Sequence, residues 1–304
     1  MPLHLGECSR RAFLLKSLAG GAGLVVSRAA PAGVAPRQNS EKWALVSDPH
    51  VAADVTTARK DANMADNVRR AAAEILAMGA PPAGVIVNGD CAHRDGQVGD
   101  YRTFRKLFID PLVAKKLPVH VTLGNHDNRE RFLQGVNKPA VSPVEGRLVS
   151  VLQGRHANIF LLDTLDRTRE MSGTVGERQV AWLDKSLAAM NDLPAVVMGH
   201  HPLADDHPFR ERGGIRDSKP LWDVLRRHRH VKAYLFGHNH FWGAFQRDGI
   251  HLVNLPSTAW TFLPVYPTGW VEMTLEPKGA ELRVRRIAGG EVPGEAGTAK
   301  LTWA

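Results

Sequence analysis

The sequence is poor in cysteine and tyrosine and contains no long run of apolar residues. Its 304 residues include only two cysteines and three tyrosines. Two cysteines cannot form a disulfide framework, so a small disulfide-stabilised scaffold is excluded. A membrane-spanning helix needs roughly 20 consecutive apolar residues. The best candidate, residues 17–26, is shorter and contains three glycines, which excludes a polytopic membrane protein.

The rest of the composition is that of an ordinary globular protein. Hydrophobic residues make up 43% of the chain and charged residues 23%, close to the average for soluble domains, which excludes a disordered chain. The length suits one large domain or two small ones. Histidine stands out, with 14 residues. Because histidine is the commonest metal ligand and the usual acid–base group near neutral pH, the composition permits a metalloenzyme.

The formal net charge is +8, but its distribution does not indicate nucleic-acid binding. Residues 1–32 carry four basic residues and one acidic residue, a net charge of +3, which leaves +5 for the remainder. The longest basic clusters that remain are residues 226–230 and 283–286. The first ends a helical pattern, where cations complement the helix dipole, and the second alternates along a predicted strand. We therefore predict no stable nucleic-acid or protein partner.

The first 32 residues resemble an export signal. Residues 9–16 read S-R-R-A-F-L-L-K, which is similar to the twin-arginine pattern S-R-R-x-F-L-K with one extra residue before the lysine. A weakly apolar stretch follows, and small residues at 30–32 offer a cleavage site. An ordinary amphipathic helix is the alternative, but the glycines disfavour it. The expectation is therefore a periplasmic or extracytoplasmic protein carried by the twin-arginine translocation machinery, or a membrane-anchored one if the signal stays uncut.

Strand and helix patterns alternate after the signal. Apolar runs predict strands at 42–46, 84–87, 119–123, 158–162, 195–198, 231–236, 250–255, 270–275 and 281–287. Helical periodicity covers residues 63–78, 101–116, 177–190 and 219–228. The β-α-β-α-β order at the start predicts an α/β domain, and the late strands predict that two mixed sheets pack as a sandwich flanked by helices. We expect one domain over residues 42–288 and a loose tail at 289–304.

Polar residues follow five of the predicted strands. Ligands bind beyond the carboxyl ends of strands in open α/β sheets, and glycines before several of these residues allow tight turns. A single D-x-H or H-x-H arises easily by coincidence, but five such groups in order do not. The residues are Asp48 and His50, then Asp90, then Asn125, His126 and Asp127, then His200 and His201, then His238 and His240.

In these positions the chain resembles the calcineurin-like metallophosphoesterase family. That family has the pattern D-x-H, G-D, G-N-H-D/E, H and G-H-x-H, and every position is filled between roughly residues 43 and 255. The chain is most similar to the bacterial branch that includes class III cyclic-nucleotide phosphodiesterases. The resemblance implies a four-layer αββα fold. One departure concerns substrate specificity: residues 91–94 read C-A-H-R, where the family often has a polar run with Asp or Glu and Arg.

The resemblance also implies two metal ions. One would be held by Asp48, His50, Asp90 and His240, and the other by Asp90, Asn125, His200 and His238. A carboxylate has two oxygens and can bridge two cations, which makes Asp90 the natural shared ligand. The spacing of two in His238-x-His240 lets both side chains project the same way from an extended backbone; alternatively, the loop turns between them and they serve one metal each. Mixed imidazole and carboxylate ligands suit iron, manganese or zinc better than magnesium.

Other residues then receive roles in the expected reaction. Two cations roughly 3.5–4 Å apart would hold a bridging hydroxide for in-line attack on phosphorus. His126 would protonate the leaving oxygen, with Asp127 orienting its imidazole; the alternative for His126 is a structural loop histidine. Arg129 and Arg94 are candidates to bind the substrate phosphate, with solvation at the surface as the alternative. His201 either assists substrate or supports the site.

The sequence thus predicts a dinuclear phosphoesterase that acts on small-molecule phosphate esters. Phosphodiesters, including cyclic nucleotides, are favoured by the resemblance, although an export signal argues against intracellular signalling. A phosphomonoesterase and a nuclease of the same fold are the alternatives. A binding protein that has lost catalysis is disfavoured, because such a relative would have gaps among the ligands. Trp260, Phe262, Tyr266 and Trp270 either form a base-stacking wall or pack in the core.

Overall fold

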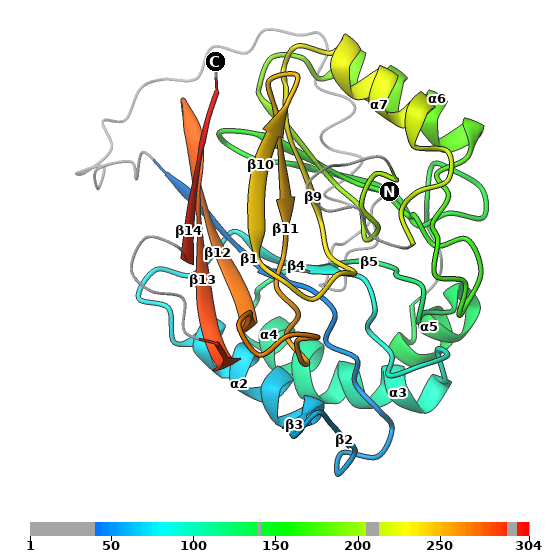
Figure 1. Ribbon diagram of the computed structural model, residues 1–304, viewed down its shortest axis with the longest axis vertical. Coiled ribbons are helices and arrows are strands. Elements are labelled where there is room, and N and C mark those ends of the chain that lie inside the picture. Colours follow the sequence, from blue (N-terminus) through cyan, green and yellow to red (C-terminus); the bar gives the residue numbers. More distant parts are fainter. Residues whose placement is uncertain (1–39, 139–140, 205–212, 291–296, 304) are drawn as a thin grey trace, which may run out of the picture.

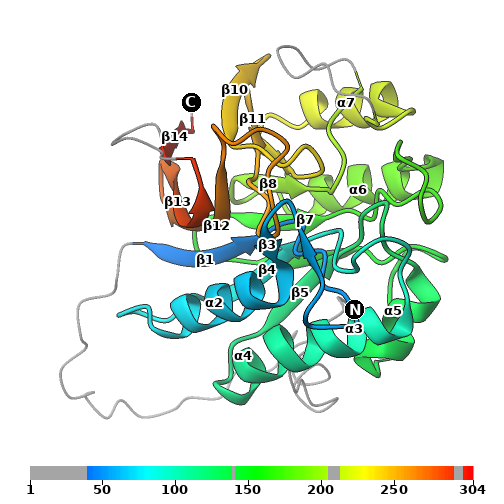
Figure 2. The ribbon, with the colours of Figure 1, turned by 60° about the horizontal axis from the view of Figure 1, so that its bottom comes forward.

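The computed structural model describes residues 40–138, 141–204, 213–290 and 297–303. The predicted export signal at 1–32 lies outside these ranges. Two six-stranded sheets pack face to face with helices on their outer sides, as Figures 1 and 2 show. The predicted α/β sandwich of two mixed sheets is confirmed.

The first sheet has the strand order β14-β13-β12-β1-β4-β5. Strands β1, β4 and β5 run parallel, and β12 pairs antiparallel with β1. The five residues of β4 are all buried, which explains their nearly continuous apolar sequence. The strands are β1 (Glu41–Val46), β4 (Gly84–Asn88), β5 (Val119–Thr122), β12 (Pro267–Glu276), β13 (Gly279–Gly289) and β14 (Thr298–Thr302).

The second sheet has the strand order β10-β11-β9-β8-β7-β6. Its four central strands are parallel, and β6 and β10 are antiparallel edges. The strands are β6 (Ser150–Gln153), β7 (Asn158–Leu161), β8 (Ala195–Met198), β9 (Val231–Phe236), β10 (Gly243–Arg247) and β11 (Ile250–Asn254). A separate hairpin of two residues per strand, β2 (Ala58–Arg59) and β3 (Ala62–Asn63), follows β1.

Helices cover both outer faces. Helices α2 and α3, the π-helical turn η1 and α4 lie against the first sheet, and α6 and α7 lie against the second (Figure 2). The bounds are α2 (Met64–Leu76), α3 (Val98–Phe104), η1 (Arg105–Ile109), α4 (Asp110–Ala114), α5 (Arg129–Val136), α6 (Glu177–Ala189) and α7 (Ser218–Arg227). The helix predicted at 101–116 is therefore an α–π–α segment that begins at Val98.

Alternation along the strands produces the four layers. In β1, Ala44 and Val46 belong to the core under the helices, whereas Trp43 and Leu45 belong to the core between the sheets. In β9, Leu235 faces the space between the sheets and Tyr234 faces α6 and α7. Successive side chains of a strand point to opposite faces, so one strand contributes to two cores and ties adjacent layers together.

The tail prediction was wrong for residues 298–302. These residues form β14, which pairs antiparallel with β13 along the edge of the first sheet. Only Leu301 of this strand is fully buried, so the segment lacks the apolar run that predicts a strand. The sequence patterns also missed α5, β6, β10 and the β2–β3 hairpin, all of which are short.

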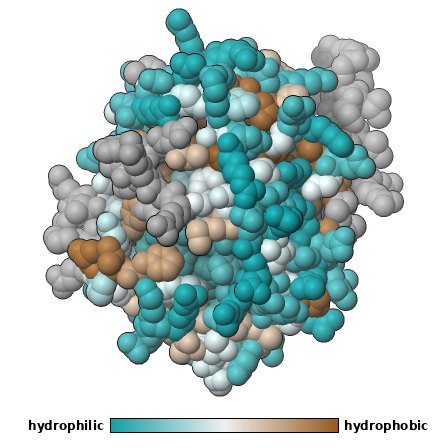
Figure 3. All heavy atoms as spheres, turned by 45° about the vertical axis from the view of Figure 1, so that its right-hand side comes forward, coloured by the Kyte–Doolittle hydropathy of each residue, from teal (hydrophilic) through white to brown (hydrophobic). Residues whose placement is uncertain are grey.

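The surface of the molecule is consistent with apolar residues that lie mainly in the cores between the layers. On the face shown in Figure 3, hydrophilic side chains predominate and apolar ones are scattered. No helix in the described part of the chain is both long enough and apolar enough to cross a membrane.

Candidate metal centre

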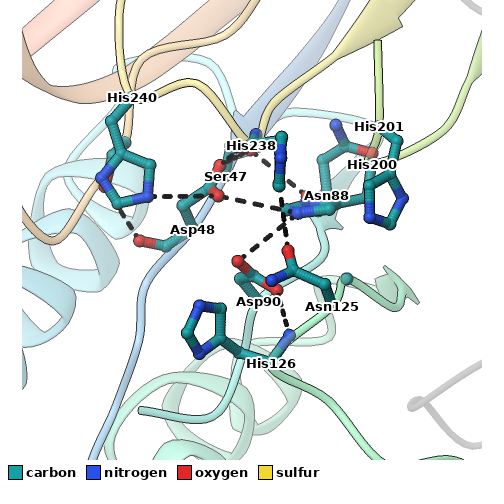
Figure 4. Close-up of polar contacts among 12 residues, drawn as sticks. Ser47, Asp48, Asn88, Asp90, Asn125, His126, His200, His201, His238 and His240 are labelled. Carbon is teal, nitrogen blue, oxygen red and sulfur yellow. Dashed lines mark hydrogen bonds and ion pairs between the residues drawn. The ribbon is translucent and has the colours of Figure 1, made fainter. Parts of the chain in front are cut away.

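The loops that follow five parallel strands meet at one point between the two sheets. Strands β1, β4 and β5 of the first sheet and β8 and β9 of the second all end there. All seven residues predicted to bind metal lie together in this place, and Figure 4 shows the side chains of the six that it labels converging. They are Asp48, His50, Asp90, Asn125, His200, His238 and His240.

A first group of donor atoms surrounds the carboxylates of Asp48 and Asp90. His50 Nε2 lies 3.1 Å from His240 Nε2 and 3.6 Å from Asp90 Oδ2. His240 Nε2 lies 3.4 Å from Asp48 Oδ1. These four residues are the set that the sequence predicted for one metal ion.

A second group lies on the other side of Asp90. His200 Nε2 is 3.4 Å from Asp90 Oδ2 and 3.9 Å from Asp48 Oδ1. Asn125 Oδ1 is 3.0 Å from His238 Nδ1. The Asp90 carboxylate therefore stands between both groups, which is the position that a shared ligand requires.

The histidine rings are held by backbone carbonyl groups. Three imidazoles use Nδ1 for such a contact, which leaves Nε2 facing the carboxylates. Metal-binding histidines have this arrangement, because a bond from the other ring nitrogen fixes the tautomer and the ring orientation. The contacts are His50 Nδ1 to His93 O at 3.3 Å, His200 Nδ1 to Asn88 O at 2.9 Å and His240 Nδ1 to Trp260 O at 2.8 Å.

Backbone strain is concentrated in the same loops. Five of the seven residues have a positive φ: Asp48 (50°), His50 (44°), Asp90 (50°), His238 (69°) and His240 (53°). Residues other than glycine rarely adopt this conformation, and strain of this kind clusters at functional sites. The surrounding fold thus holds these side chains in an arrangement that the isolated loops would not favour.

Glycines allow the loops to approach each other. A Cβ at Gly124 would overlap Asp90, and one at Gly237 would overlap Ser47 and Asp48. Gly89 has a φ of 80°, and a Cβ there would meet the ring of His200. The glycines that precede the candidate ligands are therefore required by close packing of the loops, and the positive φ of Gly89 fits the tight turn that the sequence predicted.

The arrangement of the donor atoms suits binding of a cation better than hydrogen bonding among the donor atoms themselves. Within the described residues, Asp48 Oδ1 and His200 Nε2 are buried and have no hydrogen-bond partner. Leaving buried polar atoms unpaired costs free energy, so native proteins rarely do so without a reason. A metal ion bound by the carboxylates and imidazoles would satisfy both atoms at once.

The electrostatics of the site also favour a positive charge. Burial alone would lower the pKa of His200, but Asp90 and Asp48 outweigh it and raise that pKa to about 10. Burial would raise the pKa of Asp48, yet His200 and His240 hold it at about 2. Burial together with the neighbouring His200 lowers the pKa of His238 to about 4, so this imidazole is neutral and available as a ligand.

His126 lies at the edge of the centre. Its ring is partly exposed and stands 4.9 Å from the ring of His50. Its backbone N–H donates to Asp90 Oδ1 at 2.8 Å. His126 also forms a group with His50 and Asp90 whose ligand atoms lie within 4.8 Å of one another.

The predicted orienting role of Asp127 is wrong. The ring of His126 is held instead by the backbone oxygen of Arg94, 2.7 Å from its Nδ1. The Asp127 carboxylate is buried and accepts hydrogen bonds from the backbone N–H groups of Gly124, Cys91 and Ala92. Asp127 therefore ties the loop after β5 to the loop after β4. Burial raises its pKa to about 6, with a further contribution from Asp90.

The structure also contradicts the predicted substrate contact of Arg129. Its guanidinium forms a bidentate ion pair with the buried carboxylate of Asp163, with N–O distances of 2.7 and 2.8 Å, and donates to the backbone oxygen of Leu165. It is thus engaged in holding the loop after β7. The side chain of Arg94 is exposed, and its contact with substrate stays a prediction.

The four aromatic residues fit partly the prediction of core packing and partly the prediction of a base-stacking wall. Trp270 is 2% exposed and packs in the core. Trp260 is also buried, but its ring lies 4.4 Å from that of His50 and supports the centre. Phe262 is 52% exposed and its ring lies 4.8 Å from that of His240. Tyr266 is half-buried, with its ring 5.3 Å from that of Phe241. Of these four residues, Phe262 is therefore the one with an exposed ring beside the centre.

Three residues that the sequence did not predict support the ligands. Ser47 Oγ donates to Asp48 Oδ2 at 2.5 Å, and Ser257 Oγ donates to the backbone oxygen of Asp48 at 3.0 Å. Asn88 Nδ2 donates to the backbone oxygen of Gly199, which joins β4 to β8. Ser47 and Asn88 directly precede loops that carry candidate ligands, so their positions in the sequence could have indicated a supporting role. Nothing in the sequence indicates such a role for Ser257.

The four-layer fold and this clustered site define a class of protein, the metal-dependent phosphoester hydrolases. Residues 42–241 match the family described as Calcineurin-like phosphoesterase. This match covers more than half of the 304 residues, so the chain belongs to that family and is a hydrolase acting on phosphoester bonds.

Several curated proteins resemble the chain. A Synechococcus protein named probable cyclic nucleotide phosphodiesterase is 29% identical over 198 residues, which cover 64% of this chain and 73% of the relative. The 3',5'-cyclic adenosine monophosphate phosphodiesterase CpdA of Haemophilus influenzae is 24% identical over 260 residues, covering 82% and 91%.

Solved structures share the fold. A dimetal phosphatase from Danio rerio has a TM-score of 0.64 and 14% identity, covering 87% of this chain and 99% of its own. A purple acid phosphatase from yellow lupin has a TM-score of 0.61 and 13% identity, covering 86% of this chain and 54% of its own. At these identities the likeness establishes the fold alone.

Proposed function

We propose that this protein hydrolyses phosphodiesters, with cyclic nucleotides as the favoured substrates, and that it uses two transition-metal ions. The observation that carries the proposal is the position of the Asp90 carboxylate, 3.6 Å from His50 Nε2 on one side and 3.4 Å from His200 Nε2 on the other. Relatives named as cyclic nucleotide phosphodiesterases support the choice of substrate.

The residues divide into two ligand sets that share Asp90. Asp48, His50 and His240 complete one set, whose ligand atoms lie within 4.8 Å of one another. Asn125, His200 and His238 complete the other. This mixture of imidazole, carboxylate and amide ligands favours iron, manganese or zinc. Two such ions would polarise the phosphoryl oxygens and lower the pKa of a water molecule for attack on phosphorus.

His126 is placed to protonate the leaving group. Its Nδ1 is held by the backbone oxygen of Arg94, and its backbone is tied to Asp90. The ring is therefore fixed while Nε2 remains free to deliver a proton. A sugar alkoxide is a poor leaving group, so a proton donor here accelerates cleavage of a cyclic or other alkyl diester.

The exposed ring of Phe262 supports a substrate with an aromatic group. It stands beside His240 at the rim of the centre, and Lys60 Nζ lies 4.8 Å from its centroid. Stacking of a base on an aromatic side chain contributes about 1–3 kcal/mol, more than the 0.5–1 kcal/mol of an exposed cation–π contact. A nucleobase can therefore displace the lysine from the ring.

A substrate panel tests this function. The purified protein, loaded with Mn²⁺ or Fe²⁺, is assayed on cyclic AMP, on bis-p-nitrophenyl phosphate and on p-nitrophenyl phosphate, with and without EDTA. We expect EDTA-sensitive hydrolysis of both diesters that exceeds hydrolysis of the monoester. Faster hydrolysis of the monoester would identify a phosphomonoesterase, and inactivity on all three with metal bound would reject hydrolysis of these esters. Salt-dependent cleavage of DNA would identify a nuclease.

We also propose export through the twin-arginine machinery. The support is the S-R-R-A-F-L-L-K segment at 9–16, which precedes a weakly apolar stretch. Replacing Arg10 and Arg11 together by lysine keeps the charge and removes the pattern. Cell fractionation would then find the variant in the cytoplasm and the wild type outside it; the same distribution for both would reject the proposal.

A further inference from the structure

His201 is buried beside the second ligand set, and the predicted ligands do not include it. Its ring lies 4.8 Å from that of His200 and 5.0 Å from that of His238. The three residues each offer a ligand atom within 4.8 Å of the others. His201 is 0% exposed, and within the described residues its Nε2 has no hydrogen-bond partner.

The hydrogen bonds of Thr164 decide which ring nitrogen of His201 carries the proton. Thr164 Oγ1 accepts the backbone N–H of His201 at 3.2 Å and lies 2.7 Å from His201 Nδ1. Thr164 is fully buried, and among the described residues Nδ1 is the only acceptor within reach of its hydroxyl proton. The hydroxyl therefore donates to Nδ1, which places the ring proton on Nε2.

This proton changes what His201 can bind. A metal ion needs the lone pair of a ring nitrogen, and Nδ1 and Nε2 offer none in this arrangement. His201 is therefore not a ligand, although it lies close to two. The Nε2–H of His201 lacks an acceptor among the described residues, and an anion bound in the site would supply one.

We propose that the Nε2–H of His201 donates a hydrogen bond to a phosphoryl oxygen of the bound ester and of the phosphate product. This inference rests on the proposed phosphoesterase function and names one of its substrate-contacting residues. It assigns Thr164 as the positioning residue, because its hydroxyl selects the tautomer that can donate.

The surroundings keep the ring in this orientation. Tyr234 Oη donates to the backbone oxygen of His201 at 2.8 Å. A Cβ at Gly173 would meet the imidazole of His201, so the absence of a side chain there lets the chain lie against the ring. The backbone of Thr174 in turn donates to the backbone oxygen of Thr164 at 3.0 Å. A fixed donor loses little entropy when it binds an anion.

Nitrogen NMR of the histidines tests the tautomer directly. In the Zn²⁺-loaded, ¹⁵N-histidine-labelled protein, we expect the His201 ring to carry its proton on Nε2. Inorganic phosphate should shift that signal, while the signal of His230, whose ring lies next to His228, stays in place. In Thr164→Val the proton should move toward Nδ1. A proton on Nδ1 in the wild type, or an Nε2–H signal that phosphate leaves unchanged, would overturn the proposal.

Variants separate the donor role from a ligand role. His201→Phe should keep the zinc content of the wild type and bind inorganic phosphate about tenfold to a hundredfold more weakly, the loss expected for a hydrogen bond to a charged group. His201→Gln, which retains an N–H donor, should recover part of this affinity, and His230→Gln should change nothing. Loss of zinc would show that His201 is a ligand, and unchanged phosphate affinity would show a structural role.

The outcomes also separate this inference from the proposed function. If the wild type binds phosphate through His201 but hydrolyses no ester, the phosphoesterase function fails and the anion contact stands. If the esters are hydrolysed but His201→Phe binds phosphate normally, the function stands and this inference fails. Should His201→Phe fail to fold, the wild-type NMR experiment still decides the question.

Discussion

Asp90 and His200 meet across the two sheets, with Asp90 Oδ2 3.4 Å from His200 Nε2. Asp90 follows β4 of the first sheet and His200 follows β8 of the second. The two sheets are joined further by the hydrogen bond from Asn88 Nδ2, at the end of β4, to the backbone oxygen of Gly199, after β8, at 3.1 Å. The candidate metal centre is thus formed where the sandwich closes, so folding of both sheets assembles it.

Replacing His126 by alanine should affect substrates according to their leaving group. Without a proton donor, hydrolysis of cyclic AMP should fall about 10²–10⁴-fold. Hydrolysis of bis-p-nitrophenyl phosphate should fall far less, because nitrophenolate leaves without a proton. Measured kcat values for both substrates test this, with metal content as the control. An equal loss on both substrates, or loss of metal, would instead indicate that His126 is a ligand alongside His50 and Asp90.

Removing the ring of Phe262 should weaken binding of substrates that carry a base. For Phe262→Ala we expect kcat/KM on cyclic AMP to fall about fivefold to a hundredfold, since stacking is worth about 1–3 kcal/mol. A diester without an aromatic group, such as glycerophosphocholine, should be unaffected. Val265→Ala is the matched control, because Val265 is 67% exposed and lies nearby on the same loop. Equal changes on the two diesters would contradict base stacking.

Arg129 should matter for stability rather than for substrate binding. Arg129→Ala leaves the fully buried Asp163 without its bidentate partner, and we expect a loss of about 2–3 kcal/mol in the free energy of unfolding. The ion pair of Arg178 with Glu145 is exposed on both sides, so Arg178→Ala should cost little. Urea denaturation compares the two variants. A raised KM for Arg129→Ala with normal stability would restore the substrate-binding prediction.

Metal affinity should rise with pH. In the metal-free protein Asp90 and Asp48 overcome the effect of burial and raise the pKa of His200 to about 10. Below a pH of about 10, His200 therefore carries a proton that a bound cation must displace. His238, with a pKa of about 4, has none to lose. We expect the affinity for Mn²⁺, measured by calorimetry at pH 6.5, 7.5 and 8.5, to increase up to about tenfold per pH unit. Affinity independent of pH would contradict this protonation state.

The same shifts predict how the metal-free protein responds to pH. The raised pKa of His200 gives stability that is fully present below its ordinary value of 6.5 and is lost as the pH rises through about 10. The lowered pKa of Asp48 gives stability that is present above its ordinary value of 3.8 and is lost as the pH falls through about 2. Both groups therefore contribute fully between pH 4 and 6.5.

The sequence predicted the ligand cluster because such residues follow strands. Parallel strands place their carboxyl ends at one edge, so Asp48, Asp90 and His200 could be brought together without knowledge of any contact. The apolar runs and the order of strands and helices likewise predicted two mixed sheets. Both predictions depend on local patterns that recur along the chain, so each occurrence strengthens the prediction made from the others.

Residues whose partners are distant in sequence could not be assigned in this way. Asp127 follows His126 directly, yet it binds the backbone of Cys91 and Ala92, and His126 is held by a backbone carbonyl, which has no sequence signature. Arg129 pairs with Asp163, 34 residues away. The sequence did not predict β14, because this strand is stabilised by pairing with β13 and few of its own side chains are buried.

Metal analysis of the wild type and of Asp90→Asn tests the central claim most directly. After loading with Mn²⁺ and removal of excess metal, the wild type should retain two equivalents per chain, and Asp90→Asn should retain fewer because both ligand sets lose their shared carboxylate. Asp184→Asn, on the outer face of α6 where it pairs with Arg227, should retain two. Fewer than two equivalents in the wild type, or full retention by Asp90→Asn, would contradict a centre in which Asp90 joins two metal ions.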